Sequence, residues 1–231
     1  MNSEEFEDTY WSHARLDSAR ARIDCDLRAL LDLAQTFKVA TTCLDLFCGP
    51  ISHGARMAAY GWESLLVDSH SAHLKSAASF DARPGNIETL RGCIPNCLPE
   101  RQFGLVLAMW NSLGFETSEG GIRAVLKASW QRVAHPGLLV FQTPSPPKTR
   151  LSAKVKTGRD GVPCIRVTWR QKRQTHWHFD FLLMNWVPRI YVCHQEIICR
   201  DQTLAMLAGL GVERASCILL GGRETFVAYR R

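Results

Sequence analysis

The sequence predicts one α/β domain, built on an open and mainly parallel sheet with an antiparallel β insertion before its last helix. Short buried apolar runs alternate with segments of helical period over residues 39–145, and this alternation predicts the parallel sheet. Residues 146–200 lose the helical period and alternate like strands, which predicts the insertion. The 231 residues, of which 46% are hydrophobic, are enough to bury one full core.

The predicted domain spans residues 1–231 and has three parts. We expect an N-terminal helical lid over about 1–38, a core formed by 39–145 and 201–231, and the insertion over about 146–200. No run approaches the roughly 20 apolar residues of a membrane span. The acidic, polar N-terminus resembles neither a secretory signal nor a transit peptide. We therefore expect a cytoplasmic protein without membrane association.

Each core element has its own signal in the sequence. Apolar residues at three- and four-residue steps predict an amphipathic helix over residues 15–37. The elements after it are expected, in order, as strand 42–47, helix 52–60, strand 64–67, helix 72–80, a short strand before Gly85, strand 103–109 and helix 118–133. A His-Pro-Gly turn at 135–137 then precedes a fifth strand, LLVFQT.

The insertion and the C-terminal segment complete the order. GRDGVP is expected as a hairpin turn between alternating strands at 154–156 and 165–170. HWHFDFLLMNW and RIYVCHQEII are typical of two further strands. Asp201 is expected to cap the last helix, which Gly209 or Gly211 ends, and SCILL and TFVAY form the closing strands.

The segment Leu44–Gly54 is the most informative one for function. A buried strand runs there into a tight turn and opens a helix, and such a helix start with a close-approach glycine can accept a nucleotide-like ligand. Asp68 ends the next strand, where a carboxylate can bind both hydroxyls of a ribose. Capping of the following helix is the alternative role of Asp68.

Five segments together resemble the class I S-adenosylmethionine-dependent methyltransferases, in particular a small-molecule subgroup. LDLFCGPISHG resembles motif I, VDSHSAHLKSA the ribose-binding motif and GNIETL the loop beside the adenine. FGLVLAMWNSLGF resembles the fourth-strand motif beside the transferable methyl, and RVAHPGLLVFQT the Pro-Gly turn and fifth strand. The resemblance covers residues 10–230 and implies a Rossmann-like, seven-stranded methyltransferase sheet. It also implies S-adenosylmethionine as cofactor and S-adenosylhomocysteine as product.

Three positions differ from the family pattern. Phe47 and Ile51 stand at the first and third motif glycines, and a β-branched residue such as Ile51 does not readily adopt a positive φ. Asn86 stands where an aspartate commonly holds the adenine amino group, and its amide oxygen can accept the same hydrogen bond.

The resemblance also implies the site residues. The expected cofactor contacts are Tyr10, Trp11, Arg15, Asp45, Gly49, Asp68, Ser69, Asn86, Ile87 and Trp110. Candidate catalytic groups are Asn111, His176 and His178, and candidate substrate contacts are Trp186, Arg189, Tyr191 and His194. Packing in the core or the insertion is the alternative role of the tryptophans. We expect no metal, since the nine cysteines show no C-x-x-C pair and are expected as structural thiols.

The predicted function is methyl transfer to a nitrogen or oxygen of a small polar metabolite, with toxin or antibiotic biosynthesis as one setting. The alternatives are a cofactor-binding protein with lost or changed chemistry, an RNA or DNA methyltransferase, and a nicotinamide oxidoreductase. A net charge of +6 invites the nucleic-acid alternative. However, residues 146–200 alone carry +8 and the rest of the chain −2, so we expect a small-molecule partner rather than nucleic acid. The basic insertion either attracts an anionic substrate or is a solvated face.

Overall fold

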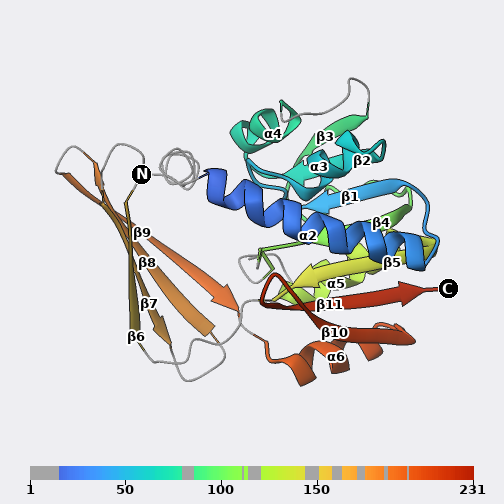
Figure 1. Ribbon diagram of the computed structural model, residues 1–231. Helices are drawn as coiled ribbons and strands as arrows, with labels where there is room; N and C mark the ends of the chain where they lie inside the picture. The colour runs from blue at the N-terminus through green and yellow to red at the C-terminus, as the bar shows by residue number, and fades with distance from the viewer. Residues whose placement is uncertain are drawn as a thin grey trace.

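The computed structural model describes residues 16–79, 86–110, 112–113, 121–143, 151–157, 163–170, 175–184, 187–196 and 198–231. For residues 16–20 and for the strands within 151–196, only the backbone belongs to this description. Two sheets result, one of seven strands and one of four (Figure 1). None of the helices in the described ranges is both long and apolar enough to cross a membrane.

The seven-stranded sheet confirms the predicted fold class. Its strands are β1 (Thr42–Leu46), β2 (Glu63–Asp68), β3 (Ile87–Arg91), β4 (Phe103–Ala108), β5 (Val133–Gln142), β10 (Arg214–Leu220) and β11 (Arg223–Arg230). They lie in the order β10-β11-β5-β4-β1-β2-β3. β3, β2, β1, β4 and β5 pair in parallel, whereas β11 pairs antiparallel with both β5 and β10. The four-stranded sheet is the predicted antiparallel insertion and contains β6 (Leu151–Thr157), β7 (Pro163–Arg170), β8 (Thr175–Met184) and β9 (Val187–Glu196).

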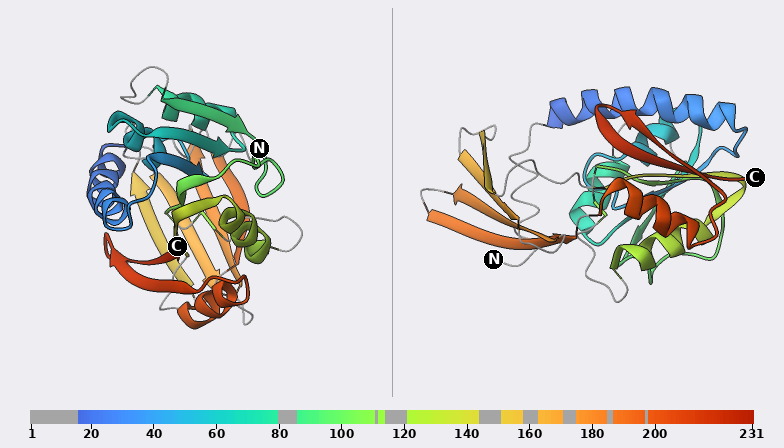
Figure 2. Two further views of the ribbon diagram at one scale, coloured as in Figure 1. Left: turned by 90° about the vertical axis from the view of Figure 1, so that its right-hand side faces the viewer. Right: turned by 90° about the horizontal axis from the view of Figure 1, so that it is seen from below.

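Helices cover both faces of the seven-stranded sheet, because successive residues of a strand point to opposite faces. The helices are α2 (Leu16–Thr36), α3 (His53–Ala59), α4 (Ser71–Ala78), α5 (Gly121–Gln131) and α6 (Arg200–Ala208). Leu44 and Leu46 belong to the core cluster on the α5 and α6 side, and Cys43 belongs to the one on the α2 and α3 side. The right-hand view of Figure 2 shows α2 on one side of the sheet and α5 and α6 on the other.

Helix α2 is firmly packed where its side chains are described. Leu27, Leu30 and Ala34 are buried against Leu105 of β4 and Val140 of β5. The amphipathic pattern predicted this helix and its inner face. This part of the expected N-terminal lid therefore belongs to the core, and a lid function for the residues before it remains a prediction.

Three local expectations are wrong. The third strand follows Gly85 instead of preceding it, because it is an exposed edge strand without the apolar run that marks a buried one. The His-Pro-Gly segment does not precede β5 but lies inside it, where the pairing with β4 shifts register between Val133 and Leu138. Asp201 lies in the first turn of α6, whose N-cap is Cys199. Gln202 Oε1 accepts the Cys199 backbone N–H at 3.0 Å. This is the hydrogen bond that the third helical residue makes to the N-cap backbone in a capping box. Gly209 ends the helix, as predicted.

Gly54 allows α3 to approach the sheet closely, and this generates a prediction. A Cβ at this position would lie 2.7 Å from Leu66 Cδ2 and 2.8 Å from Asp45 Cβ. Gly54→Ala should therefore lower the free energy of unfolding by about 1–3 kcal/mol, measured by urea denaturation. Gly209→Ala is the control, since its Cβ would meet the nearest atom at 3.5 Å, and it should change stability by less than about 0.5 kcal/mol. Equal losses in both variants would contradict the close-packing role of Gly54.

Candidate functional site

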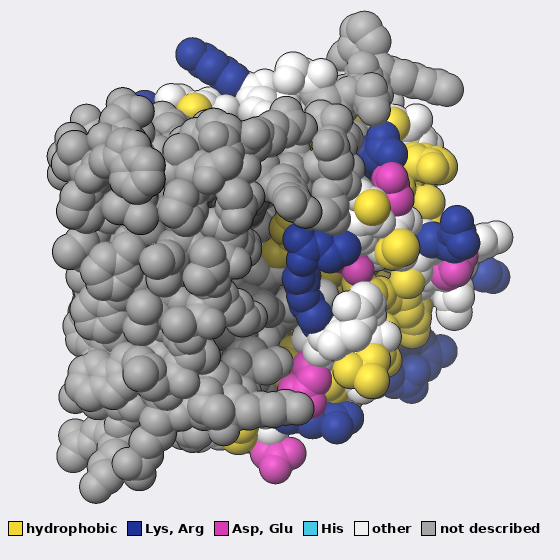
Figure 3. All heavy atoms as spheres, turned by 60° about the vertical axis from the view of Figure 1, so that its left-hand side comes forward, with side chains coloured by type: hydrophobic (Ala, Val, Ile, Leu, Met, Phe, Trp, Pro, Cys, Tyr) yellow, Lys and Arg dark blue, Asp and Glu magenta, His cyan; other side chains and the backbone are white. Residues whose placement is uncertain are grey.

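Most of the predicted cofactor contacts that the structure describes lie at one edge of the seven-stranded sheet. The carboxyl ends of parallel strands meet at the same edge, so the loop after β1, Asp68 at the end of β2 and Trp110 after β4 come together there. The arrowheads of β1 and β5 in Figure 1 point toward the four-stranded sheet, which leaves the core after β5. In Figure 3, which turns that side forward, Lys and Arg side chains lie beside the residues that are not described.

Asp45, on β1, fixes the loop after β1 through hydrogen bonds. Its Oδ2 accepts hydrogen bonds from Ser52 Oγ at 2.6 Å and from the Gly54 backbone N–H at 2.8 Å. Ser52 Oγ in turn accepts the Ala55 backbone N–H and is the N-cap of α3. Burial raises the pKa of Asp45, although the charge of His53 and these hydrogen bonds act in the opposite direction. The structure thus makes Asp45 a positioning residue of the loop rather than an exposed cofactor contact.

At Phe47 the loop keeps the backbone conformation that the first motif glycine would provide. Phe47 has φ of +54° and Gly49 has φ of +61°. For a non-glycine residue such as Phe47, this left-handed conformation costs about 1–2 kcal/mol. Ile51 is not among the described residues with positive φ, and it is buried against Ile23 of α2. The third motif position has therefore become part of the contact between the loop and α2.

Asp68 orders the turn between β2 and α4 without being the N-cap of α4, which is His70. Its Oδ1 accepts the His70 backbone N–H at 2.9 Å and lies 3.3 Å from His73 Nδ1, and its Oδ2 accepts the Gly49 N–H at 2.9 Å. Burial raises the pKa of Asp68, but these hydrogen bonds and the charge of His73 outweigh it, so the pKa lies below its ordinary value. A carboxylate accepts about four hydrogen bonds. Asp68 therefore orders the start of α4 and retains acceptor capacity on Oδ2 for a ligand hydroxyl.

Trp110 lies between the core and α2. Its backbone has φ of +61°, and its half-buried indole donates from Nε1 to Asp26 Oδ2 at 3.1 Å. The His53 ring and the indole are nearly perpendicular, with 5.3 Å between the ring centroids. Asp26 and His53 are functional-site candidates that the sequence reasoning missed. The signal for Asp26 was its place as an acidic residue on the apolar stripe of the N-terminal helix, three positions after Ile23 and four before Leu30.

The prediction that Asn86 and Ile87 border the ligand site beside Asp68 is wrong. Ile87 pairs with Ser64 at the amino end of β2, whereas Arg91 pairs with Asp68 at its carboxyl end. Four residues of a strand separate these positions, which corresponds to about 13 Å. The error follows from placing the third strand before Gly85.

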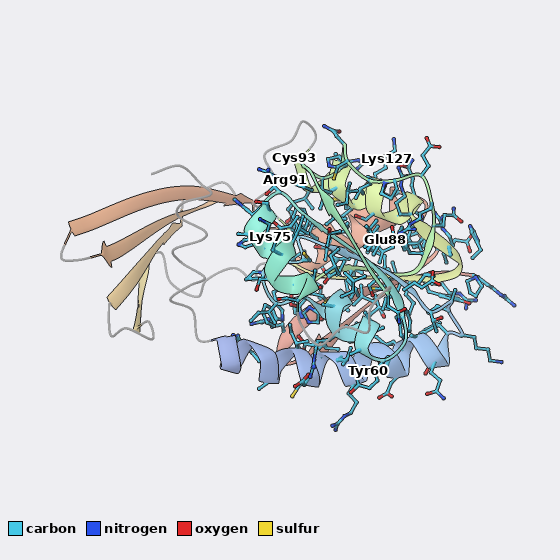
Figure 4. The ribbon with its side chains drawn as sticks, turned by 90° about the horizontal axis from the view of Figure 1, so that it is seen from above. Tyr60, Lys75, Glu88, Arg91, Cys93 and Lys127 are labelled. Carbon is cyan, nitrogen blue, oxygen red and sulfur yellow. The ribbon has the colours of Figure 1, made fainter. Side chains whose placement is uncertain are left out.

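The residues that follow β3, rather than Asn86 and Ile87, lie beside Asp68 at the carboxyl edge. The Gly92 backbone N–H donates to the Asp68 carbonyl oxygen at 3.1 Å, and the exposed Cys93 comes next. Figure 4 shows Arg91 and Cys93 toward the four-stranded sheet and Glu88 farther from it. The alternation in IETLR, followed by Gly92, was the signal that places a strand end here.

The remaining predicted residues divide into two groups. Tyr10, Trp11, Arg15, Asn111 and Trp186 lie outside the described residues. Ser69 is exposed next to Asp68, and its carbonyl oxygen accepts a hydrogen bond from Arg91 Nε at 3.1 Å. The strand pairs His176–Gln195, His178–Cys193, Asp180–Tyr191 and Leu182–Arg189 place His176, His178, Tyr191 and Arg189 on one face of the four-stranded sheet. His194 pairs with Trp177 and lies on the other face, so it does not share a surface with the two candidate bases.

The described cysteines do not form one class. Cys43 and Cys48 are buried, and burial raises the pKa of both thiols well above the ordinary value. Cys25, Cys93 and Cys199 are exposed, so the expectation of buried structural thiols is wrong for these three. Within the described ranges, no group of three or more His, Cys, Asp or Glu residues is arranged to hold a metal ion.

Solved structures with the same arrangement are methyltransferases. The sugar N-methyltransferase KedS8 from Streptoalloteichus matches 95% of this chain over 94% of its own, with a TM-score of 0.72 and 17% identity. The CcbJ methyltransferase from Streptomyces caelestis matches 90% of this chain over 89% of its own, with a TM-score of 0.70 and 16% identity. The amino pentose methyltransferase CalS10 from Micromonospora echinaspora matches 94% of this chain over 98% of its own, with a TM-score of 0.66 and 18% identity. The chain has the fold of these methyltransferases. No protein-family model matches the sequence, and no curated protein is significantly similar to it.

In this methyltransferase fold, the loop after β1 depends on Ser52, which generates a second prediction. Ser52→Ala removes the N-cap acceptor of α3 and a donor to the buried Asp45, and it should cost about 2 kcal/mol of unfolding free energy. Amide hydrogen exchange at Gly49 and Gly54 should accelerate at the same time. Ser79→Ala is the control, because Ser79 Oγ makes a hydrogen bond on the exposed end of α4. A Ser52 variant as stable as the Ser79 variant would show that Asp45 does not hold the loop through Ser52.

Proposed function

We propose that this protein binds S-adenosylmethionine and transfers its methyl group to a nitrogen or oxygen of a small polar metabolite. The observation that carries the proposal is Asp68, which is held at the carboxyl edge against the Gly49 loop with acceptor capacity left on Oδ2. The fold supports it, since CalS10 was solved with this cofactor bound and acts on an amino pentose.

The described residues fit the adenosyl part of this cofactor. The Asp68 carboxylate is suited to the ribose hydroxyls, and hydrogen bonds to an ionised acceptor are among the strong ones. Among the described residues other than Gly49 and its two chain neighbours, none has a heavy atom within 4 Å of the Cβ position of Gly49, so these residues leave space beside the carboxylate. Gly92 and Cys93 border the same edge and are suited to the adenine side. Trp110 follows β4, where the resemblance expects the transferable methyl.

The chemistry requires alignment more than acid–base catalysis. The cofactor supplies a methyl group already activated on a sulfonium centre. In transfer, the carbon–sulfur bond breaks as a bond forms to the acceptor nitrogen or oxygen, and the acceptor loses a proton. The protein must place the acceptor in line with the methyl group, and such positioning accounts for a large part of the rate. His176 and His178 share a face of the insertion and remain our candidates for accepting the proton.

The acceptor is proposed to be a small polar molecule between the carboxyl edge and the insertion. The insertion carries a charge of +8 and the remaining chain −2, which favours an acceptor with an anionic group. KedS8 is a sugar methyltransferase, and CalS10 is involved in calicheamicin biosynthesis. We therefore propose amino sugars that also carry an anionic group, and related specialised metabolites, as the first substrates to test.

Calorimetric titration with S-adenosylhomocysteine tests the binding part of the proposal. We expect a micromolar Kd for the native chain and a Kd about 10- to 100-fold higher for Asp68→Asn, because a neutral amide weakens charge-assisted hydrogen bonds. Asp24→Asn is the matched control, since it removes the same charge from an exposed pair with Arg56. Because the pKa of Asp68 lies below its ordinary value, loss of affinity through protonation of Asp68 should appear only below the pH range in which an aspartate ordinarily titrates. Absence of binding heat with the folded native chain would refute the proposal.

Mass spectrometry with a methyl-labelled cofactor tests the transfer. Label on at least one amino sugar or related acceptor, together with formation of S-adenosylhomocysteine, is the expected result. A bound cofactor without transfer to any member of a broad panel would instead indicate a binding protein with lost or changed chemistry. Oligonucleotide binding that falls steeply with salt would indicate a nucleic-acid methyltransferase.

A further inference from the structure

A chain of buried hydrogen bonds crosses the carboxyl edge of the sheet and passes through Trp110. Thr225 Oγ1 accepts from Gln142 Nε2 at 3.1 Å, and Gln142 Oε1 accepts the Trp110 backbone N–H at 2.9 Å. The Trp110 indole then donates to Asp26, whose Oδ2 also lies 3.2 Å from His53 Nε2. We call these five residues the Trp110 network. It connects β11, β5, the segment after β4, α2 and α3.

Four members of the Trp110 network are almost completely removed from solvent. Thr225 and Gln142 are 0% exposed, and Asp26 and His53 are each 3% exposed. Burying a carboxylate and an amide costs free energy unless each finds partners. An apolar side chain of similar size at these positions is often as stabilising as a buried polar group. Stability alone therefore does not explain why this chain buries polar residues at this place.

The network fixes Trp110 at two points. The Gln142 amide holds its backbone N–H, and the Asp26 carboxylate holds the far end of its indole ring. The backbone between these points has φ of +61°, which a tryptophan adopts only at a cost of about 1–2 kcal/mol. Strain of this kind persists where the surroundings determine the conformation, and it is concentrated at functional sites.

The charges around the ring also fix its position. Burial raises the pKa of Asp26, but hydrogen bonds from His53 and Trp110 and the charge of Arg223 outweigh burial, so the pKa lies below its ordinary value. Asp26 is therefore ionised at neutral pH. The guanidinium carbons of Arg22 and Arg223 lie 5.3 Å and 5.9 Å from the Trp110 ring centroid, at the distance of cation–π contacts. The indole thus has a polar anchor at its nitrogen and cations near its ring.

We propose that Asp26 and Gln142 are positioning residues, which hold the Trp110 indole as a fixed wall of the methyl-transfer site. This inference rests on the proposed function for its catalytic consequence, because it places Trp110 beside the transferred methyl group. The geometry itself is independent of that function. Asp26 acts through Trp110. Loss of the Asp26 charge should therefore disturb the alignment of the reactants, which lowers kcat, more than it weakens binding of the cofactor.

Indole resonances in a 1H–15N spectrum test the geometry without any turnover. Trp110→Phe identifies the Trp110 indole signal by its disappearance. In Asp26→Asn this signal should move upfield and its hydrogen exchange should accelerate at least about tenfold, since the acceptor has lost its charge. Asp24→Asn on the same helix should leave it unchanged. An unchanged Trp110 signal in folded Asp26→Asn would overturn the proposal.

A double-variant cycle tests the catalytic consequence. Asp26→Asn and Trp110→Phe should each lower kcat about 10- to 100-fold, with the Kd for S-adenosylhomocysteine changed less than about threefold. The double variant should be no worse than the poorer single variant, because both changes remove the same interaction. Multiplying losses in kcat would overturn the assignment of Asp26 to Trp110. If Asp26→Asn does not fold, Gln142→Met tests the other point of attachment with the same spectrum and kinetics. If the native chain transfers no methyl group, the proposed function fails, while the spectrum still decides the geometry.

Discussion

The hydrogen bonds that the buried Asp45 carboxylate accepts from Ser52 and Gly54 are the interaction on which the rest of the site depends. They fix where the loop after β1 ends and where α3 begins. From that point, Gly49 can donate to Asp68 and His53 can reach Asp26. A displacement of α3 would therefore disturb both the ribose-side carboxylate and the network around Trp110.

Three buried carboxylates at one edge require a specific distribution of donors. Asp45, Asp26 and Asp68 lie on β1, α2 and β2, and each is satisfied by groups from a neighbouring segment. The pKa of Asp45 is raised by burial, whereas donors lower the pKa of Asp26 and Asp68. The two residues that remain ionised most easily are those in contact with the histidines. The partners of these three carboxylates are the protein's own groups, so their hydrogen bonds do not depend on a ligand, and this favours binding without a large cost in ordering these segments.

The sequence predicted the sheet and the order of its elements, because hydrophobic period and motif order are local signals. It also placed Gly49 after the first strand, Asp68 at the end of the second and Trp110 after the fourth, where the structure has them. It failed at the third strand, since the partly exposed IETLR lacks the apolar run of a buried strand, and Asn86 and Ile87 were misplaced with it. Phe47 shows a different limit: its positive φ comes from the loop's hydrogen bonds and not from its residue type. The hydrogen bonds between Trp110 and Asp26 and between Gln142 and Thr225 join residues more than 80 positions apart, and no local pattern encodes them.

The central claim is that this carboxyl edge, ordered by Asp45, is an adenosyl-binding site. Hydrogen–deuterium exchange of the full chain with and without S-adenosylhomocysteine tests it most directly. The account predicts slower exchange in the Phe47–Gly54 loop, at Asp68–His70 and at Gly92–Cys93, with no change at Asn86–Glu88 on the opposite edge. Protection at Asn86–Glu88 in place of these segments, or no protection at a saturating ligand concentration, would contradict it.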